Sequence, residues 1–211
     1  MAKVIIEGVR KNFLTDQRVV TLLDETNHRF LNIWIGQVEA LVIAMALTEI
    51  PPPRPMTAHF LANVLKVTGV TLEEVRVEAL KGEFFYAIAK VRNGDVVREL
   101  DVRPSDALGL AALMSSPIYV AEELLETVGT VLPEGKTVDI FIAEEVLKGE
   151  GIVLPEGKTL RPNYSKEKTR EAILQEVEKY VNATLQVTPP TEEKREQAKQ
   201  KYLAFLLGDQ V

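Results

Sequence analysis

Two short segments of the chain combine residue types that can bind an anion. Residues 54–61 read RPMTAHFL and residues 103–110 read RPSDALGL. Each opens with Arg-Pro, places a hydroxyl residue shortly afterwards, and continues into apolar sequence typical of a helix. A proline favours a helix start, but an arginine at the positive end of a helix gains nothing unless it reaches an anion or a carboxylate. Arg54 and Arg103 are therefore candidate phosphate-binding residues, with a structural pair between Arg103 and Asp101 as the plainer alternative.

Several carboxylates stand close to these segments or at other predicted helix starts. Asp101 and Asp106 flank Arg103, Glu39 is the only charge in a long apolar run, and Glu122 follows a short predicted strand. Each carboxylate has a structural explanation, as an acid that satisfies a helix start or as the partner of an arginine. Carboxylate oxygens are also the ligands that Mg²⁺ prefers, so a divalent-cation site is the functional alternative.

His59 is the one histidine outside a predicted turn. It lies one helical turn before Asn63, so the two side chains can meet, although a surface pair is the plainer interpretation. Ser105 suits a helix start, where its hydroxyl can accept from a free backbone N–H. The sequence has no P-loop, no dinucleotide-binding glycine fingerprint, no nucleophile elbow and no HExxH motif, so the corresponding enzyme classes are not indicated.

Composition limits the class of protein further. The chain has 211 residues, is 46% hydrophobic and 27% charged, and carries a net charge of −6. This balance is ordinary for a globular protein and argues against a basic nucleic-acid clamp made by the whole chain. The absence of cysteine, of a signal peptide and of a long apolar run leads us to expect a cytoplasmic protein without a membrane segment.

Periodicity predicts an α+β fold, with a mixed, largely antiparallel sheet packed against helices. Alternating apolar residues indicate strands, and apolar residues at helical spacing indicate helices. We expect strands at 3–9, 18–25, 29–35, 72–80, 84–92, 96–102 and 117–121, and helices at 37–50, 57–68, 104–114 and 122–128. The matched form of the two Arg-Pro segments suggests a duplicated strand–helix unit.

The chain divides into a main domain and an extension. We expect the domain at 1–160, with its core at 3–128, followed by a linker and a C-terminal helical hairpin at 161–211. The two helices of the extension each carry one apolar stripe, so they must pack on the main domain or on another chain.

Three stretches together are specific enough to indicate a family: LNIWIGQVEALVIAMAL, PPPRPMTAHFLANVL and VRNGDVVRELDVRPSDALGLAALMSSPIYVAEELL. They resemble the bifunctional nuclease domain family over roughly residues 3–128. The resemblance implies a compact α+β domain with a mixed sheet that self-associates as a homodimer or a higher homo-oligomer. It also implies nuclease activity on DNA and RNA.

The sequence departs from the family pattern in the first Arg-Pro segment. The family pattern resembles Arg-Pro-Leu/Met-Thr-His-Asp-Leu, whereas this chain has Ala58 at the usual histidine and His59 at the usual aspartate. The second segment is intact. If the usual His-Asp pair were catalytic, this chain would lack the acid and would carry its imidazole about 100° further around the helix.

Two hypotheses follow. In the first, the protein is a metal-assisted phosphodiesterase, in which Mg²⁺ or Mn²⁺ activates water and steadies the leaving oxygen. Arginines would clamp the phosphate, and His59 would be the general acid or base. The metal ligands would come from Asp101, Asp106, Glu39 and Glu122, and the substrate contacts from Arg54, Arg103, Asn63 and Ser105. In the second, the protein is a non-catalytic dimeric module that binds a small anion or a protein partner.

Overall fold

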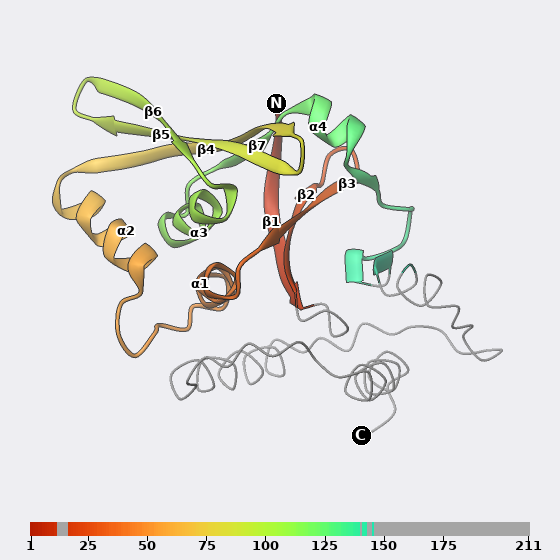
Figure 1. Ribbon diagram of the computed structural model, residues 1–211, viewed down its shortest axis with the longest axis horizontal. Helices are drawn as coiled ribbons and strands as arrows, with labels where there is room; N and C mark the ends of the chain where they lie inside the picture. The colour runs from red at the N-terminus through yellow and green to blue at the C-terminus, as the bar shows by residue number, and fades with distance from the viewer. Residues whose placement is uncertain (12–16, 140, 143–144, 146–211) are drawn as a thin grey trace.

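The computed structural model describes residues 1–11, 17–139, 141–142 and 145 of the chain. The predicted linker and C-terminal helical hairpin at 161–211 lie outside these residues. Within them the fold is α+β, as the sequence predicts, and it is built from two three-stranded meanders that share one sheet (Figure 1).

The first meander and its helix occupy the N-terminal part of the chain. Their elements are β1 (Ala2–Lys11), β2 (Arg18–Asp24), β3 (Arg29–Ile35) and α1 (Gln37–Thr48). The turn between β2 and β3 is fixed by Asp24, whose carboxylate accepts from the backbone N–H groups of Thr26 and Asn27 at 3.1 and 3.2 Å. Such local side-chain-to-backbone bonds are the usual reason for aspartate before a turn.

A helix and the second meander follow. Their elements are α2 (Thr57–Val67), β4 (Val70–Lys81), β5 (Phe84–Asn93), β6 (Val96–Val102) and α3 (Pro104–Met114). Gly94 in the β5–β6 turn has φ of +57°, which glycine adopts without the steric cost that a Cβ would bring. The chain continues through β7 (Ile118–Val120), α4 (Glu122–Thr127) and β8 (Thr130–Val131).

One eight-stranded sheet holds both meanders, in the order β6-β5-β4-β7-β1-β2-β3-β8. Strand β7 lies between the meanders, parallel to β4 and antiparallel to β1. All other neighbouring strands are antiparallel, which confirms the predicted mixed, largely antiparallel sheet. Helix α1 follows the first meander and helix α3 follows the second, so the meander–helix unit occurs twice. Helix α2 lies between the two copies in the chain.

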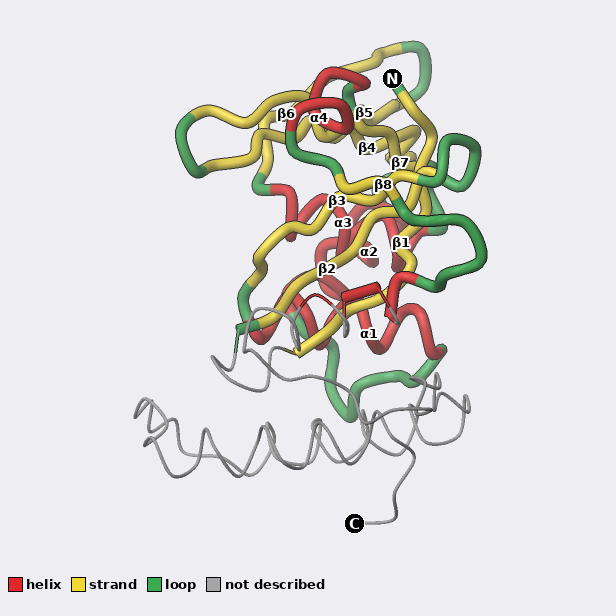
Figure 2. Tube along the Cα trace, turned by 90° about the vertical axis from the view of Figure 1, so that its right-hand side faces the viewer, coloured by secondary structure: helices red, strands yellow, loops and turns green. Residues whose placement is uncertain are grey.

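The three longer helices lie on one side of the sheet, with α3 at the centre. Figure 1 shows α1 and α3 nearly end-on beneath the curved sheet, and Figure 2 shows them behind the strands of the first meander. Leu108 of α3 is fully buried, and Gly109 lies so close to α1 that an added Cβ would be 3.4 Å from Val42. A residue without a side chain therefore lets the two helices approach closely.

The opposite face differs between the two meanders. Behind the first meander, Val138 is 2% exposed and the ring of Phe141 meets that of Phe30 edge-on at 5.7 Å. Arg10 of β1 also donates to Asp139 at 2.6 Å. Residues after β8 therefore cover the part of this face around Phe30, whereas the outer face of β4–β6 carries charged side chains such as Arg76, in keeping with an antiparallel sheet that faces water. None of the described helices combines the length and apolar character that crossing a membrane requires.

Candidate functional site

The candidate site lies where the first turns of α1 and α3 meet. Helix α1 begins at Gly36, whose carbonyl accepts from the N–H of Ala40 at 2.9 Å. Glu39, in the first turn, folds its carboxylate back over Gly36, into the space where a Cβ of residue 36 would lie. The positive end of the helix dipole stabilises a negative charge at this position.

Helix α3 presents an arginine and an aspartate at its start. Arg103 is the N-cap residue in an extended conformation, Pro104 is the first helical residue, and Asp106 lies in the first turn. The guanidinium of Arg103 donates to both oxygens of Asp106, from Nε at 2.7 Å and from Nη2 at 3.0 Å. This bidentate pair is the geometry that makes arginine a selective partner of carboxylate and phosphate groups.

A third bond joins the two helices. Nη2 of Arg103 also donates to Oε1 of Glu39 at 3.1 Å, so the guanidinium lies between two carboxylates. An arginine at a helix start gains nothing without an anion or a carboxylate, and these two acids supply the partner that Arg103 needs. We call Glu39, Arg103 and Asp106 the acid–arginine cluster.

The side chains of the acid–arginine cluster are exposed enough for a ligand to reach them, and they are charged. The side chain of Arg103 is 69% exposed, that of Asp106 44% and that of Glu39 22%. The hydrogen bonds that Arg103 donates to Asp106, reinforced by the charges of Asp106 and Glu39, raise the pKa of Arg103, so the guanidinium stays charged. Two carboxylates and one guanidinium leave one net negative charge at the cluster, which favours a cation nearby.

Two of the predicted metal ligands lie elsewhere. Asp101 is exposed on β6 opposite Ile88, and Arg103 does not pair with it because the strand ends at Val102. Glu122 begins α4 and accepts from Arg29 at 2.8 Å. The structure therefore brings together Glu39 and Asp106, and no group of three or more metal-ligating side chains occurs among the residues it describes.

Arg29 belongs to a separate buried network. It donates to Asp24 at 2.9 Å as well as to Glu122, and Asp24 is fully buried. This network ties the β2–β3 turn to α4 on the far side of the first meander. The sequence did not predict this network, because Asp24 and Arg29 have the ordinary types of residues that flank a turn.

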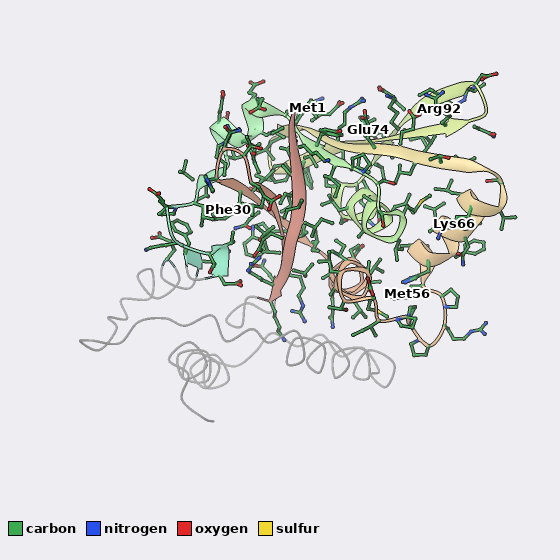
Figure 3. The ribbon with its side chains drawn as sticks, turned by 180° about the vertical axis from the view of Figure 1, so that it is seen from behind. Met1, Phe30, Met56, Lys66, Glu74 and Arg92 are labelled. Carbon is green, nitrogen blue, oxygen red and sulfur yellow. The ribbon has the colours of Figure 1, made fainter. Side chains whose placement is uncertain are left out.

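The first Arg-Pro segment has a different geometry from the second. Met56 is the N-cap residue of α2, so Arg54 precedes the helix instead of capping it; Figure 3 labels Met56 and Lys66 near the two ends of α2. Arg54 is exposed and forms no ion pair with any residue in the described part of the chain. It is thus a cation that remains available to a ligand.

His59 and Asn63, predicted to meet on α2, are not joined by a hydrogen bond between described atoms. Asn63 is exposed, and His59 is half-buried, with its Nδ1 buried and without a described partner. Burial lowers the pKa of His59, so its imidazole is neutral at neutral pH. Ser105 is half-buried in the first turn of α3, next to the acid–arginine cluster but without a side-chain cap bond there.

Comparison with known proteins connects this geometry to a family. The bifunctional nuclease domain model matches residues 20–133, which include the whole acid–arginine cluster. An uncharacterized protein of Mycobacterium tuberculosis is 33% identical over 138 residues, which are 64% of this chain and 80% of that protein. Bifunctional nuclease 1 of Arabidopsis thaliana is 25% identical over 122 residues, which are 56% of this chain and 38% of that protein. Bifunctional nuclease 1 of Oryza sativa subsp. japonica is 25% identical over 105 residues, 48% of this chain and 32% of that protein.

Proposed function

The chain belongs to the bifunctional nuclease domain family, and from this premise we propose that it hydrolyses phosphodiester bonds of DNA or RNA at the acid–arginine cluster. The observation that carries the proposal is the Arg103 guanidinium, 69% exposed and held between Glu39 and Asp106 at the meeting point of two helix starts. Two acids and one arginine are the groups that phosphodiester hydrolysis needs to move a proton and to neutralise a phosphate.

Arg103 is the phosphate-binding group in this proposal. Its two parallel bonds to Asp106 have the same fork geometry that it would use toward two phosphate oxygens. A bound phosphate then takes one or both bonds from the carboxylates and receives the guanidinium charge where negative charge develops. Arg54, exposed before α2, would contact a neighbouring phosphate of the same strand.

Once Arg103 binds phosphate, the carboxylates of Glu39 and Asp106 can bind a metal ion. Mg²⁺ commonly keeps several waters and takes one or two protein carboxylates together with phosphate oxygens, a donor set that Glu39 and Asp106 fit. These two residues would hold Mg²⁺ or Mn²⁺, and the ion would supply Lewis-acid stabilisation of the phosphoryl group. Asp101 and Glu122 are outside the acid–arginine cluster and are not part of this proposal.

Hydrolysis adds water across a P–O bond. The water oxygen forms a new bond to phosphorus, the bond to the leaving oxygen breaks, and the leaving oxygen gains a proton. A carboxylate of the acid–arginine cluster accepts a proton of the attacking water, and a solvent water supplies the proton that the leaving oxygen takes up, so that the carboxylic acid returns its proton to solvent. His59 is the second candidate for a proton carrier, because a neutral imidazole accepts a proton, but it has no described hydrogen bond that orients it.

A second candidate function is a non-catalytic module that binds a small anion. It is favoured by one observation: among the described residues, no three metal-ligating side chains gather at a single point. In that case Arg54 and Arg103 bind the anion and no bond is broken. Ligand-dependent thermal stabilisation without turnover would distinguish this module from a nuclease. Self-association and a cytoplasmic location stay predictions in both cases.

The deciding experiment compares two aspartates that differ in position. Purified protein, Asp106→Asn and Asp101→Asn are incubated with labelled single-stranded DNA and RNA in Mg²⁺, Mn²⁺ or EDTA. We expect cleavage that needs metal, disappears in Asp106→Asn and persists in Asp101→Asn, since Asp101 is exposed and outside the acid–arginine cluster. Equal cleavage by the unmodified chain and Asp106→Asn would overturn the proposal.

A further inference from the structure

We propose that the indole of Trp34 is a stacking platform for a nucleotide base, and that the protein therefore prefers single-stranded nucleic acid. The inference rests on the proposed function, because it places the base next to the phosphate bound by Arg103. It adds a substrate class and a binding residue outside the acid–arginine cluster.

The exposure of Trp34 is the first observation. Trp34 is the only tryptophan of the chain and is 58% exposed, although tryptophan is a residue that proteins usually bury for the most part. It lies near the end of β3, where the alternating residues Leu31 and Ile33 point into the core. Trp34 therefore points to the opposite face, on which the register sets it beside Val19 of β2.

The position of Trp34 in the chain is the second observation. It precedes Gly36 by two residues, and two residues of extended chain span at most about 7 Å. The carboxylate of Glu39 lies over Gly36 and accepts from Arg103 at 3.1 Å. An exposed aromatic ring and an exposed phosphate-binding arginine thus stand on either side of one helix start, close enough for one strand to meet both.

The flat face of the indole carries this inference, because a flat aromatic face is the type of surface on which bases stack. The nearest basic residues in the register, Lys11 and Arg18, are opposite each other on β1 and β2, and Arg18 is opposite Ile35. Arg18 is 7% exposed and shares the core face with Ile35, so its charge lies on the other side of the sheet from the indole.

The exposed apolar face of α2 fits a base less well. The exposed stripe of α2 contains one aromatic ring among aliphatic side chains, namely Phe60, Leu61, Val64 and Val67. Branched aliphatic groups do not offer a flat face for stacking. The single-strand preference follows from Trp34 because the bases of a duplex already stack on one another, whereas an unpaired base has a free face.

Intrinsic fluorescence gives a direct test, since Trp34 is the only source of indole emission. The full chain is titrated in EDTA, where cleavage is suppressed, with single-stranded DNA, the matching duplex, and an abasic strand of the same length. We expect quenching by the single strand, weaker quenching by the duplex and none by the abasic strand.

Variants complete the test by anisotropy of a labelled single strand. Trp34→Ala should weaken binding about tenfold, as loss of one base–aromatic stack does, while Trp34→Phe should restore most of it. Phe84→Ala is the matched control, because Phe84 is 73% exposed on the second meander, and it should bind as the unmodified chain does.

The outcomes separate this inference from the proposed function. Unchanged binding and cleavage by Trp34→Ala would overturn the role of Trp34 and leave the nuclease proposal standing. Equal quenching by the normal and abasic strands would also overturn stacking, because it would report phosphate contacts alone. Absence of both binding and cleavage for every nucleic acid would overturn the nuclease proposal, and the inference with it.

Discussion

The carboxylate of Glu39 fills the space beside Gly36 that a side chain of residue 36 would need. Gly36 has φ of −70° and ψ of 160°, a conformation open to any residue, so backbone strain is not the reason for glycine. The missing Cβ leaves room for the Glu39 carboxylate to lie over the helix start and reach Arg103. The glycine therefore helps to position an acid of the candidate site.

Gly36→Ala tests this relationship. The new methyl group must displace the flexible end of Glu39, so we expect cleavage to fall roughly 10- to 100-fold, as small misplacements of reacting groups do. The free energy of unfolding should change by less than about 1 kcal/mol. Gly8→Ala is the control, since its Cβ would make only ordinary contact, at 3.5 Å, with Arg10. Unchanged cleavage by Gly36→Ala would show that the position of Glu39 is not critical.

Arg103→Ala tests the phosphate-binding group. Loss of a preorganised charge that stabilises the transition state typically costs about 100- to 1,000-fold in rate, and we expect a loss of that size. Stability should be nearly unchanged because the side chain is 69% exposed. Arg98→Ala, an exposed arginine on β6, should retain full activity in the same steady-state assay. A similar loss in both variants would indicate a general charge effect instead.

Asp24→Asn tests the buried network behind the β2–β3 turn. Burial alone would raise the pKa of Asp24, but hydrogen bonds from Asn27 and Arg29 outweigh it and lower the pKa below its usual value. The charged carboxylate therefore stabilises the fold above about pH 4, and this contribution disappears as pH falls through the lowered folded-state pKa. In urea unfolding at pH 7, the variant should lose about 2 kcal/mol, and the difference should shrink in acid.

Glu126→Gln serves as the control for that experiment. Glu126 lies exposed on α4, near the same network but outside it. In this variant, the free energy of unfolding should fall at acidic pH as it does in the unmodified chain. A constant stability deficit of Asp24→Asn down to pH 2 would argue against a lowered pKa.

His59→Gln tests the effect of burying an imidazole. Because burial lowers the pKa of His59 below its usual value, the unfolded chain binds a proton more readily than the folded one. The contribution of the neutral imidazole to the free energy of unfolding is then fully present above about pH 6.5. It declines as pH falls toward the lowered folded-state pKa. Urea unfolding between pH 8 and pH 5 should show this decline in the unmodified chain and a flatter profile in the variant. His28→Asn, at a turn with φ of +49° that asparagine tolerates, should keep the decline.

Phe141→Ala tests whether residues after the family match belong to the domain. Phe141 packs edge-on against Phe30, which is 2% exposed, and Val138 beside it is also buried. Removing the ring should lower the free energy of unfolding by about 2–3 kcal/mol. The exposed ring of Phe84 gives the control, and Phe84→Ala should change stability by less than about 0.5 kcal/mol. Equal effects would mean that Phe141 contributes nothing by packing.

The local structure was predictable because each signal acts over a few residues. Asn93-Gly94 marked the β5–β6 hairpin, and the predicted strand 96–102 coincides with β6. Pro104 marked the start of α3 for the same reason, since its fixed φ suits the first helical turn. These features depend on backbone preferences that one sequence reveals.

The partner of Arg103 was harder to predict. Strand alternation favoured Asp101, but the chain turns into a helix at Pro104, and the first turn brings Asp106 to the guanidinium instead. Glu39 lies 64 positions away, so only the packing of α1 on α3 could reveal it. Its signal in the sequence was that it is the one charge in an apolar helix.

The cover of the first meander also depends on tertiary packing. Val138 and Phe141 belong to a segment whose sequence predicts no clear role, and the structure buries Val138 and packs Phe141 against Phe30 of β3. Arg10, in a strand that reads as ordinary, is bonded to Asp139 across 129 positions. A single sequence does not predict either contact, because each joins residues far apart in the chain and leaves no pattern among neighbouring residues.

The bond between Arg103 and Glu39 has a consequence for the timing of activity. Its donor and acceptor come from different meander–helix units, which a ribosome delivers one after the other. Contacts between residues far apart in sequence form late, after the loops between them have closed. A nascent chain from which only the first unit has emerged contains Glu39 but not Arg103 or Asp106. A proteolytic fragment of either unit likewise lacks part of the acid–arginine cluster. The proposed cleavage activity is thus withheld from incomplete chains, and mixing two separately made halves offers a way to switch it on.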